Sequence, residues 1–253
     1  MKAYLLKIFI FSIFFSGSIF ALYINADKNI DPYYYKFTTP KQKNIIIGIS
    51  RAALGVKPSI LNKKLDDTFF NYAFTLNHSP FGPAYFSSIK KKIQHKTENG
   101  IFIVGVTPWS IASITNAPNN EDKFRENKLC VAKTPYVNTR PNFSYLFKNY
   151  MGKNYKLIPA FREEDNIKLH ITGWVERTLP MDSSSLAKRL KKKLVFYRKR
   201  ISQFSYSSLR YRYLKKTVRF LNNHGKVFVI RLPIHPKMED IEEILYIEYK
   251  DMR

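Results

Sequence analysis

The chain of 253 residues has little cysteine, few acidic side chains and few glycines, and these shortages exclude several classes of protein. Cys130 is the only cysteine, so the sequence has no pair for an internal disulfide and neither a zinc ribbon nor a CxxC redox motif. The five histidines show no metal spacing such as HExxH, and the nine glycines form neither GxxxxGK[ST] nor GxGxxG. We therefore expect no metal site, no nucleotide site and no cofactor.

The shortage of acidic residues leaves the chain strongly basic. Only 19 Asp and Glu face 43 Lys and Arg, for a formal net charge of +24. Such a charge predicts an anionic partner, which is a phospholipid surface, an acidic glycan or nucleic acid. A content of 45% hydrophobic and 15% aromatic residues excludes a disordered tail. The length is typical of one large or two small domains.

The N-terminal segment is a signal peptide or a signal anchor. Lys2 and Lys7 precede the uncharged apolar run from Ile8 to Ile24. A removable signal has about 7 to 15 apolar residues and small side chains at both positions of its cleavage site, whereas Ile19 occupies the outer position before Ala21. We therefore favour an uncleaved anchor over residues 1–25. Basic residues before it predict a single-pass protein with an exported C-terminal domain, which excludes nucleic acid as the expected partner.

The segments after the anchor predict an α/β domain. Residues 26–42 are expected to form a short stalk, and residues 43–253 the domain. A parallel strand buried on both faces is predicted at 44–48, where a β-branched run ends in glycine. Two further strands are predicted at 101–106 and 226–232, each an apolar run that follows a glycine. Helical patterns precede the second and third strands. Three passages between helix and strand indicate a mostly parallel sheet.

A long insertion, 115–182, separates the second and third strands, and a segment of that length is typical of a functional loop, for example a lid. Within it, 169–182 alternates enough to predict a hairpin. From Ser183 to Met238 there is no acidic residue, and apolar side chains recur with helical spacing between 186 and 204. This pattern predicts a helix with one core face and one basic face. Three interpretations of the basic face stay open: it is solvated, it docks on an anionic lipid or polymer, or it pairs with the acidic tail.

The most informative motif is GISRAALGVKPSIL, Gly48 to Leu61, which places Ser50 directly after the first strand and before a helix. Ligands of parallel sheets bind beyond the carboxyl ends of the strands, where backbone amides that open a helix stabilise an oxyanion. Ser50 is therefore a candidate nucleophile, with a helix N-cap as the alternative. Arg51 is placed to bind a carboxylate or phosphate of the substrate, or else faces solvent.

GISRAALGVKP is similar to the first sequence block of the SGNH/GDSL hydrolase family, as found in membrane-anchored bacterial members. The segments 71–93 and 104–111 resemble the second and third blocks in order and type, and the resemblance spans roughly 43–236. It implies a flavodoxin-like, doubly wound sheet and a serine esterase or O-acyltransferase at the bacterial inner membrane. The implied substrate is an acylated polymer of the cell envelope. Ser50 is then the nucleophile, and Asn77 and Gly82 are candidate oxyanion donors.

The sequence also departs from the family. Ile49 replaces the aspartate of the first block, and the third-block asparagine has no counterpart. The family's Asp-x-x-His is Leu232 to His235 here, so His235 is a candidate base without its aspartate, or part of a plain structural loop. The complete dyad is expected beyond Arg253 or is absent. Two other hypotheses stay open: a noncatalytic anchored protein that binds an acidic glycan or lipid surface through basic helices, and a truncated remnant.

Overall fold

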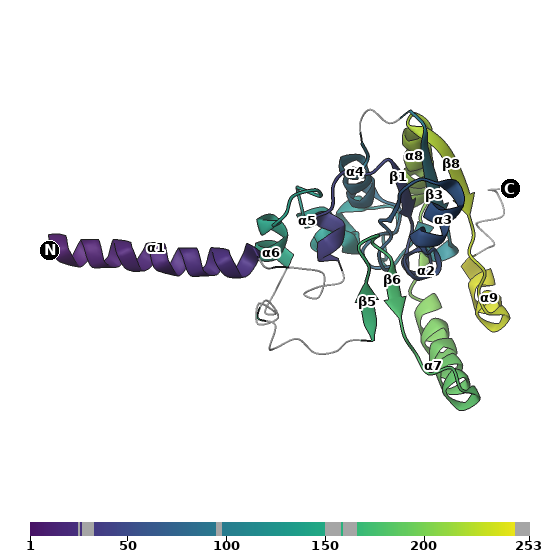
Figure 1. Cartoon of the computed structure of the whole chain (residues 1–253). Coiled ribbons are helices and arrows are strands. Elements are labelled where there is room, and N and C mark those ends of the chain that lie inside the picture. The colour runs from purple at the N-terminus through teal and green to yellow at the C-terminus, as the bar shows by residue number, and fades with distance from the viewer. Residues whose placement is uncertain (25, 27–32, 95–97, 150–157, 159–165, 246–253) are drawn as a thin grey trace.

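The computed structural model describes residues 1–24, 26, 33–94, 98–149, 158 and 166–245. In Figure 1 one long helix extends from a body in which helices surround a sheet. The α-helices are α1 (Lys2–Ile24), α2 (Ser50–Gly55), α3 (Pro58–Leu65), α4 (Pro83–Lys92), α5 (Cys130–Lys133), α6 (Phe143–Asn149), α7 (Ser183–Ile201), α8 (Ser208–Asn222) and α9 (Pro236–Glu242). The strands are β1 (Asn44–Ile47), β2 (Phe69–Asn71), β3 (Gly100–Gly105), β4 (Ala112–Ser113), β5 (Ile167–Leu169), β6 (Val175–Arg177), β7 (Ser205–Tyr206) and β8 (Gly225–Ile230).

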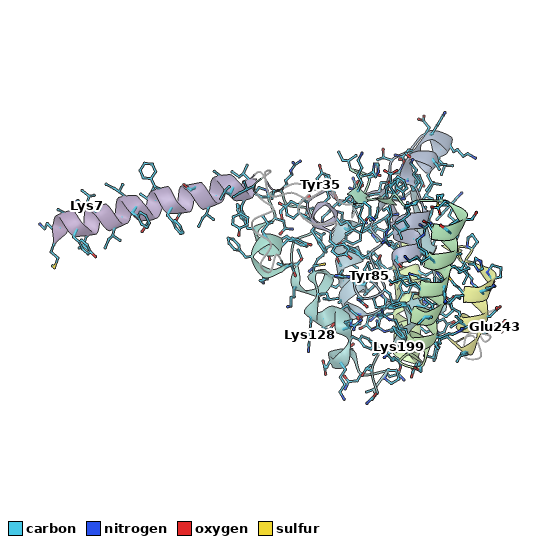
Figure 2. The ribbon with its side chains drawn as sticks, turned by 90° about the horizontal axis from the view of Figure 1, so that it is seen from below. Lys7, Tyr35, Tyr85, Lys128, Lys199 and Glu243 are labelled. Atoms are coloured by element: carbon cyan, nitrogen blue, oxygen red, sulfur yellow. The ribbon has the colours of Figure 1, made fainter. Side chains whose placement is uncertain are left out.

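The N-terminal helix α1 is long and apolar enough to cross a membrane. Its 23 residues rise about 34 Å at 1.5 Å each, compared with a hydrocarbon core of about 30 Å. Figure 2 shows Lys7 far from the body, in which Tyr85 is buried. The last turns of α1 contact α6, with 5.5 Å between the ring centres of Phe20 and Phe143. The expected apolar N-terminal helix is confirmed.

The central sheet is parallel, with the strand order β2-β1-β3-β8 among the described residues. Ile45 of β1 aligns with Phe70 of β2 and with Phe102 of β3. Parallel neighbours need crossover connections, and the helices supply them. This arrangement confirms the predicted α/β class with its parallel sheet.

Helices cover both faces of the sheet. Ile45 and Ile47 belong to a cluster that includes Leu214 and Leu221 of α8, whereas Ile46 packs with Ala52 and Ala53 of α2. Successive residues of a strand point to opposite faces, so a run of three isoleucines is buried in full when both faces are covered.

Strand and hairpin positions agree with the pattern in most places. β1, β3 and β8 lie within two residues of their predicted bounds. The hairpin predicted at 169–182 is observed as β5 and β6, so it begins two residues earlier and ends five residues earlier than expected. Gly173 in its turn has a φ of 76°. β2 was not predicted, because three residues are too short to show a period of two.

Part of the segment expected as a stalk, 26–42, lies in the core. Tyr34 and Phe37 are fully buried, and the Nζ of Lys36 donates to the carbonyl oxygens of Asn71 at 2.7 Å and Gly173 at 2.6 Å. Burial without a carboxylate lowers the pKa of Lys36 to about 7. The segment is therefore attached to β2 and to the hairpin, while residues 27–32 lie outside the described part of the chain.

The long basic helix α7 covers less core than its pattern predicts. Ile201 is its one buried residue, whereas Val195 and Phe196 are exposed. Among the described residues no ion pair joins the acidic tail to α7: Glu239 binds Arg231 at 2.9 Å, and Glu242 binds a residue of α2. The rest of the tail, 246–253, lies outside the described residues.

Candidate functional site

A cleft of about 200 Å³ lies at the carboxyl end of β1, between the loops of the sheet and α7. Several residues singled out in the sequence contribute to it. Its lining consists of Ile49, Ser50, Arg51, Thr75, Leu76, Asn77, Trp109, Lys193, Phe196, Tyr197 and Arg200. α7 and α9 contact each other at this end of the molecule (Figure 1).

Close packing after β1 positions Ser50. Gly48 has a φ of +141°, and a Cβ atom there would lie 2.7 Å from the carbonyl oxygen of Gly105. A Cβ on Gly105 would in turn lie 2.9 Å from the Cβ of Ala52. Glycines at both positions therefore let α2 begin directly against the ends of β1 and β3, which places Ser50 in the cleft.

Ser50 is not a helix cap. Ile49 occupies the N-cap position of α2, and Ser50 is the first helical residue. The hydroxyl of Ser50 makes no hydrogen bond to any described residue, so no base contacts it in this part of the chain. The N-cap interpretation is wrong, and the nucleophile interpretation stays a prediction.

Asn77 lies in the same cleft, in the loop after β2. Its Oδ1 accepts hydrogen bonds from Arg125 at 2.6 Å and from Arg200 at 3.0 Å. Because two cationic donors bind this atom, it is the oxygen of the amide group, and the other atom is the nitrogen Nδ2. The Nδ2 group makes no hydrogen bond within the described chain and is the end available to a ligand.

Arg51 is attached to α9. Both of its Nη atoms donate to the carboxylate of Glu242, which is fully buried and also accepts from the Nε1 of Trp109. Burial disfavours the charge of Arg51, and the hydrogen bonds and charge of Glu242 outweigh this and hold its pKa above the ordinary value. The carboxylate of Glu242 thus attaches α9 to Arg51 and Trp109, which both line the cleft.

Gly82 and His235 are not among the residues that line this cleft. Gly82 precedes α4, where a Cβ would lie 2.8 Å from a carboxylate oxygen of Glu126. His235 caps α9, and its Nδ1 accepts from the backbone N–H of Lys237 at 3.2 Å. No hydrogen bond among the described residues joins His235 to Ser50. The structure therefore brings together Ser50, Arg51 and Asn77 alone of the predicted set.

Sequence reasoning missed the contribution of α7. Lys193, Tyr197 and Arg200 all line the cleft. Their spacing of four and then three residues places them on one face of a helix. The sequence predicts the basic helix, and this spacing indicates a shared face, but nothing in the sequence indicates that the face meets the end of β1.

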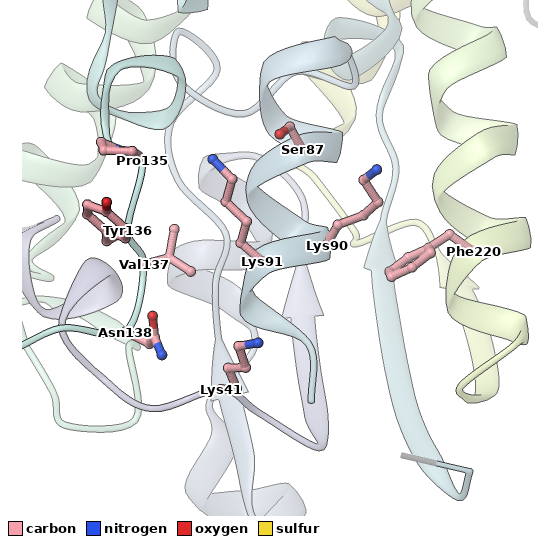
Figure 3. Close-up of a pocket in the computed structure, with 9 residues that line it drawn as sticks. All are labelled: Lys41, Ser87, Lys90, Lys91, Pro135, Tyr136, Val137, Asn138 and Phe220. Atoms are coloured by element: carbon pink, nitrogen blue, oxygen red, sulfur yellow. The ribbon is translucent and has the colours of Figure 1, made fainter. Parts of the chain in front are cut away.

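A second hollow, of about 440 Å³, lies over α4 (Figure 3). Lys41, Lys90 and Lys91 line it, and the side chains of Lys90 and Lys91 point away from each other in the figure. It is not at the carboxyl ends of the strands, so it is a weaker candidate than the cleft. Within the described residues no three His, Cys, Asp or Glu side chains gather as a metal site.

No family model, curated protein or solved structure matches this chain. Its function is therefore inferred from the chemistry of the cleft.

Proposed function

We propose that the protein is a serine esterase or O-acyltransferase of the SGNH type that acts on an acylated polymer of the bacterial cell envelope. The observation that carries this proposal is the position of Ser50, after β1 at the first residue of α2 and in a cleft. A hydroxyl in that place meets a ligand bound beyond the strand ends.

The strand order supports the proposal. In doubly wound sheets ligands bind where the strand order reverses, next to the first strand. The order β2-β1-β3-β8 reverses between β1 and β3, and Ser50 follows β1. The order equals the first four strands of a flavodoxin-like sheet, which is the architecture expected of this family.

The proposed reaction has two steps. The Oγ of Ser50 attacks the ester carbonyl carbon, its proton passes to a base, and the alcohol leaves as the acyl-serine forms. Water or a sugar hydroxyl then attacks the acyl-serine and restores Ser50. The Nδ2 of Asn77 donates to the oxyanion in both steps. His235 is the base only when the loop between β8 and α9 brings it to Ser50, since catalytic hydrogen bonds often form only with substrate bound.

We also propose that α1 anchors the enzyme in the bacterial inner membrane. The helix is long and apolar enough to span, and Lys2 and Lys7 lie at its N-terminal end. Basic residues before a first span favour a cytoplasmic N-terminus. The α/β body then lies outside the cytoplasm, where envelope polymers are found.

Labelling of the detergent-solubilised full chain with a fluorophosphonate probe tests the proposal. Ser50→Ala should abolish labelling, whereas Ser59→Ala, at an exposed position of the next helix, should leave it unchanged. Ser50 caps no helix, so its replacement should lower the free energy of unfolding by less than about 1 kcal/mol. A folded wild-type protein that stays unlabelled would refute an activated serine.

A second candidate is a noncatalytic protein that binds an acidic glycan or lipid surface. The observation that favours it is the exposure of Val195 (59%) and Phe196 (48%) on the basic helix α7. Binding to phosphatidylglycerol vesicles that Ser50→Ala leaves unchanged and that salt weakens steeply would support it. Binding insensitive to salt would contradict it.

A further inference from the structure

The cleft beside Ser50 is lined by more cationic side chains than the neighbouring carboxylates neutralise. Arg51, Lys193 and Arg200 all line it. Glu242 pairs with Arg51, but no carboxylate in the described part of the chain pairs with Lys193 or Arg200. Two cations without a counter-charge therefore face the space where a substrate would bind.

Neighbouring arginines add to this charge. Arg125 donates to the same Asn77 oxygen as Arg200, so two guanidinium groups share one uncharged acceptor. Burial and then the charge of Arg125 lower the pKa of Arg200, whose Nε is buried without a partner. Burial and then the charges of Arg177, Arg51 and Arg200 lower the pKa of Lys193. An anion in the cleft relieves this repulsion.

Aromatic rings hold these cations in place without neutralising them. The guanidinium of Arg200 lies 5.2 Å from the ring centre of Phe196 and 5.5 Å from that of Phe204. The Nζ of Lys193 lies 5.5 Å from the ring centre of Tyr197. Such contacts orient a charged group, but a ring carries no net charge. The repulsion therefore remains until an anion binds.

We propose that the cleft binds a phosphate group of the substrate through Lys193 and Arg200, next to the ester that Ser50 attacks. The substrate part of this inference rests on the proposed function. Arginine and lysine are the usual ligands of phosphate, and two unpaired cations suit its charge. At about 200 Å³ the cleft is smaller than the usual ligand pocket of about 300 to 1,000 Å³, so it takes one phosphate and its acyl neighbour while the rest of the molecule stays outside.

Isothermal titration of inorganic phosphate into the full chain, in non-ionic detergent at low salt, tests the site. We expect saturable binding at one site, weakened at least tenfold by Lys193→Gln and by Arg200→Gln. Lys188→Gln changes an exposed residue of the same helix that does not line the cleft, and it should leave the affinity unchanged. Circular dichroism checks that each variant is folded.

The outcomes separate the phosphate site from the proposed reaction. Phosphate affinity that both α7 variants retain would overturn the site, and acetate binding as tightly as phosphate would overturn the choice of ligand. Fluorophosphonate labelling of Ser50 without phosphate binding would refute the site alone. Phosphate binding without labelling would keep the site and remove the acyl transfer. A glycerol phosphate oligomer and phosphatidylglycerol micelles, used as competitors, show whether polymer or lipid supplies the group, and competition by neither would overturn the substrate inference.

Discussion

Replacing Glu126 by glutamine should destabilise the fold strongly, although the side chain keeps its shape. Glu126 is fully buried, and Arg210 of α8 donates to its two carboxylate oxygens at 2.7 and 3.0 Å. The side chain of Arg210 is 3% exposed, and its guanidinium lies 3.7 Å from the ring centre of Phe124. The pair therefore attaches the inserted segment to α8 through groups that water does not reach.

The magnitude follows from what glutamine leaves behind. Loss of one partner of a buried ion pair leaves an uncompensated charge and costs about 3 to 5 kcal/mol. We expect about 3 kcal/mol, because the glutamine oxygen still accepts one hydrogen bond and Phe124 still contacts the guanidinium. For a chain of this size 1 kcal/mol corresponds to about 2 to 4 °C, so the melting temperature should fall by about 9 °C.

Thermal unfolding followed by tryptophan fluorescence, on the detergent-solubilised full chain, measures this effect. Glu239→Gln is the matched control, because its pair with Arg231 is exposed (47% and 36%) and such pairs contribute at most about 1 kcal/mol. The double variant Glu126→Gln with Arg210→Met should recover part of the loss by removing the unpaired charge. A drop no larger than that of the control would refute the importance of burial for this pair.

Two further predictions concern the surroundings of the cleft. Gly48→Ala should lower the free energy of unfolding, measured by chemical denaturation, by at least about 2 kcal/mol. A side chain at its φ of +141° is strained, and the new Cβ would lie only 2.7 Å from a carbonyl oxygen. Gly55→Ala, whose Cβ would meet only an ordinary contact at 3.6 Å, should cost under about 1 kcal/mol, and equal losses would contradict the argument. Burial lowers the pKa of His78 from 6.5 to about 4, so the unfolded chain takes up its proton first and stability falls as the pH drops from 6.5 to 4. The free energy of unfolding should fall by about 3 kcal/mol over this range, and His78→Gln should remove most of that pH dependence. An unchanged pH dependence in the variant would refute the role of His78.

The parallel strands were the most predictable elements. Asn44–Ile47 and Gly100–Gly105 are largely apolar runs bordered by glycine. A strand that is covered on both faces has apolar residues at nearly every position, so it can be recognised in the sequence. The strand Phe69–Asn71 cannot be recognised in this way, because it has only three residues and pairs with β1 at the edge of the described sheet. The candidate nucleophile was predictable for the same reason as the strands, since Ser50 is defined by its place after β1.

The partners of Ser50 depended on contacts between distant segments. Glu242 reaches Arg51 across 191 residues of chain, and Arg200 reaches Asn77 across 123. Charge counts in the sequence indicated a basic helix and an acidic tail, and pairing between them was one of the expectations. In the structure Glu239 and Glu242 of the tail bind other residues, and no ion pair among the described residues joins the tail to the cations of α7 that line the cleft.

The sequence by itself determined the apolar N-terminal helix, the α/β class and the position of Ser50, because each depends on residues that are close together in the chain. Hydrophobic periodicity and glycine placement act over a few residues and can be seen without a structure. The tertiary structure decided that Asn77, Arg51 and the basic face of α7 share one cleft, and that Gly82 and His235 do not line it. That grouping depends on how helices pack against the sheet, which brings together side chains more than a hundred residues apart.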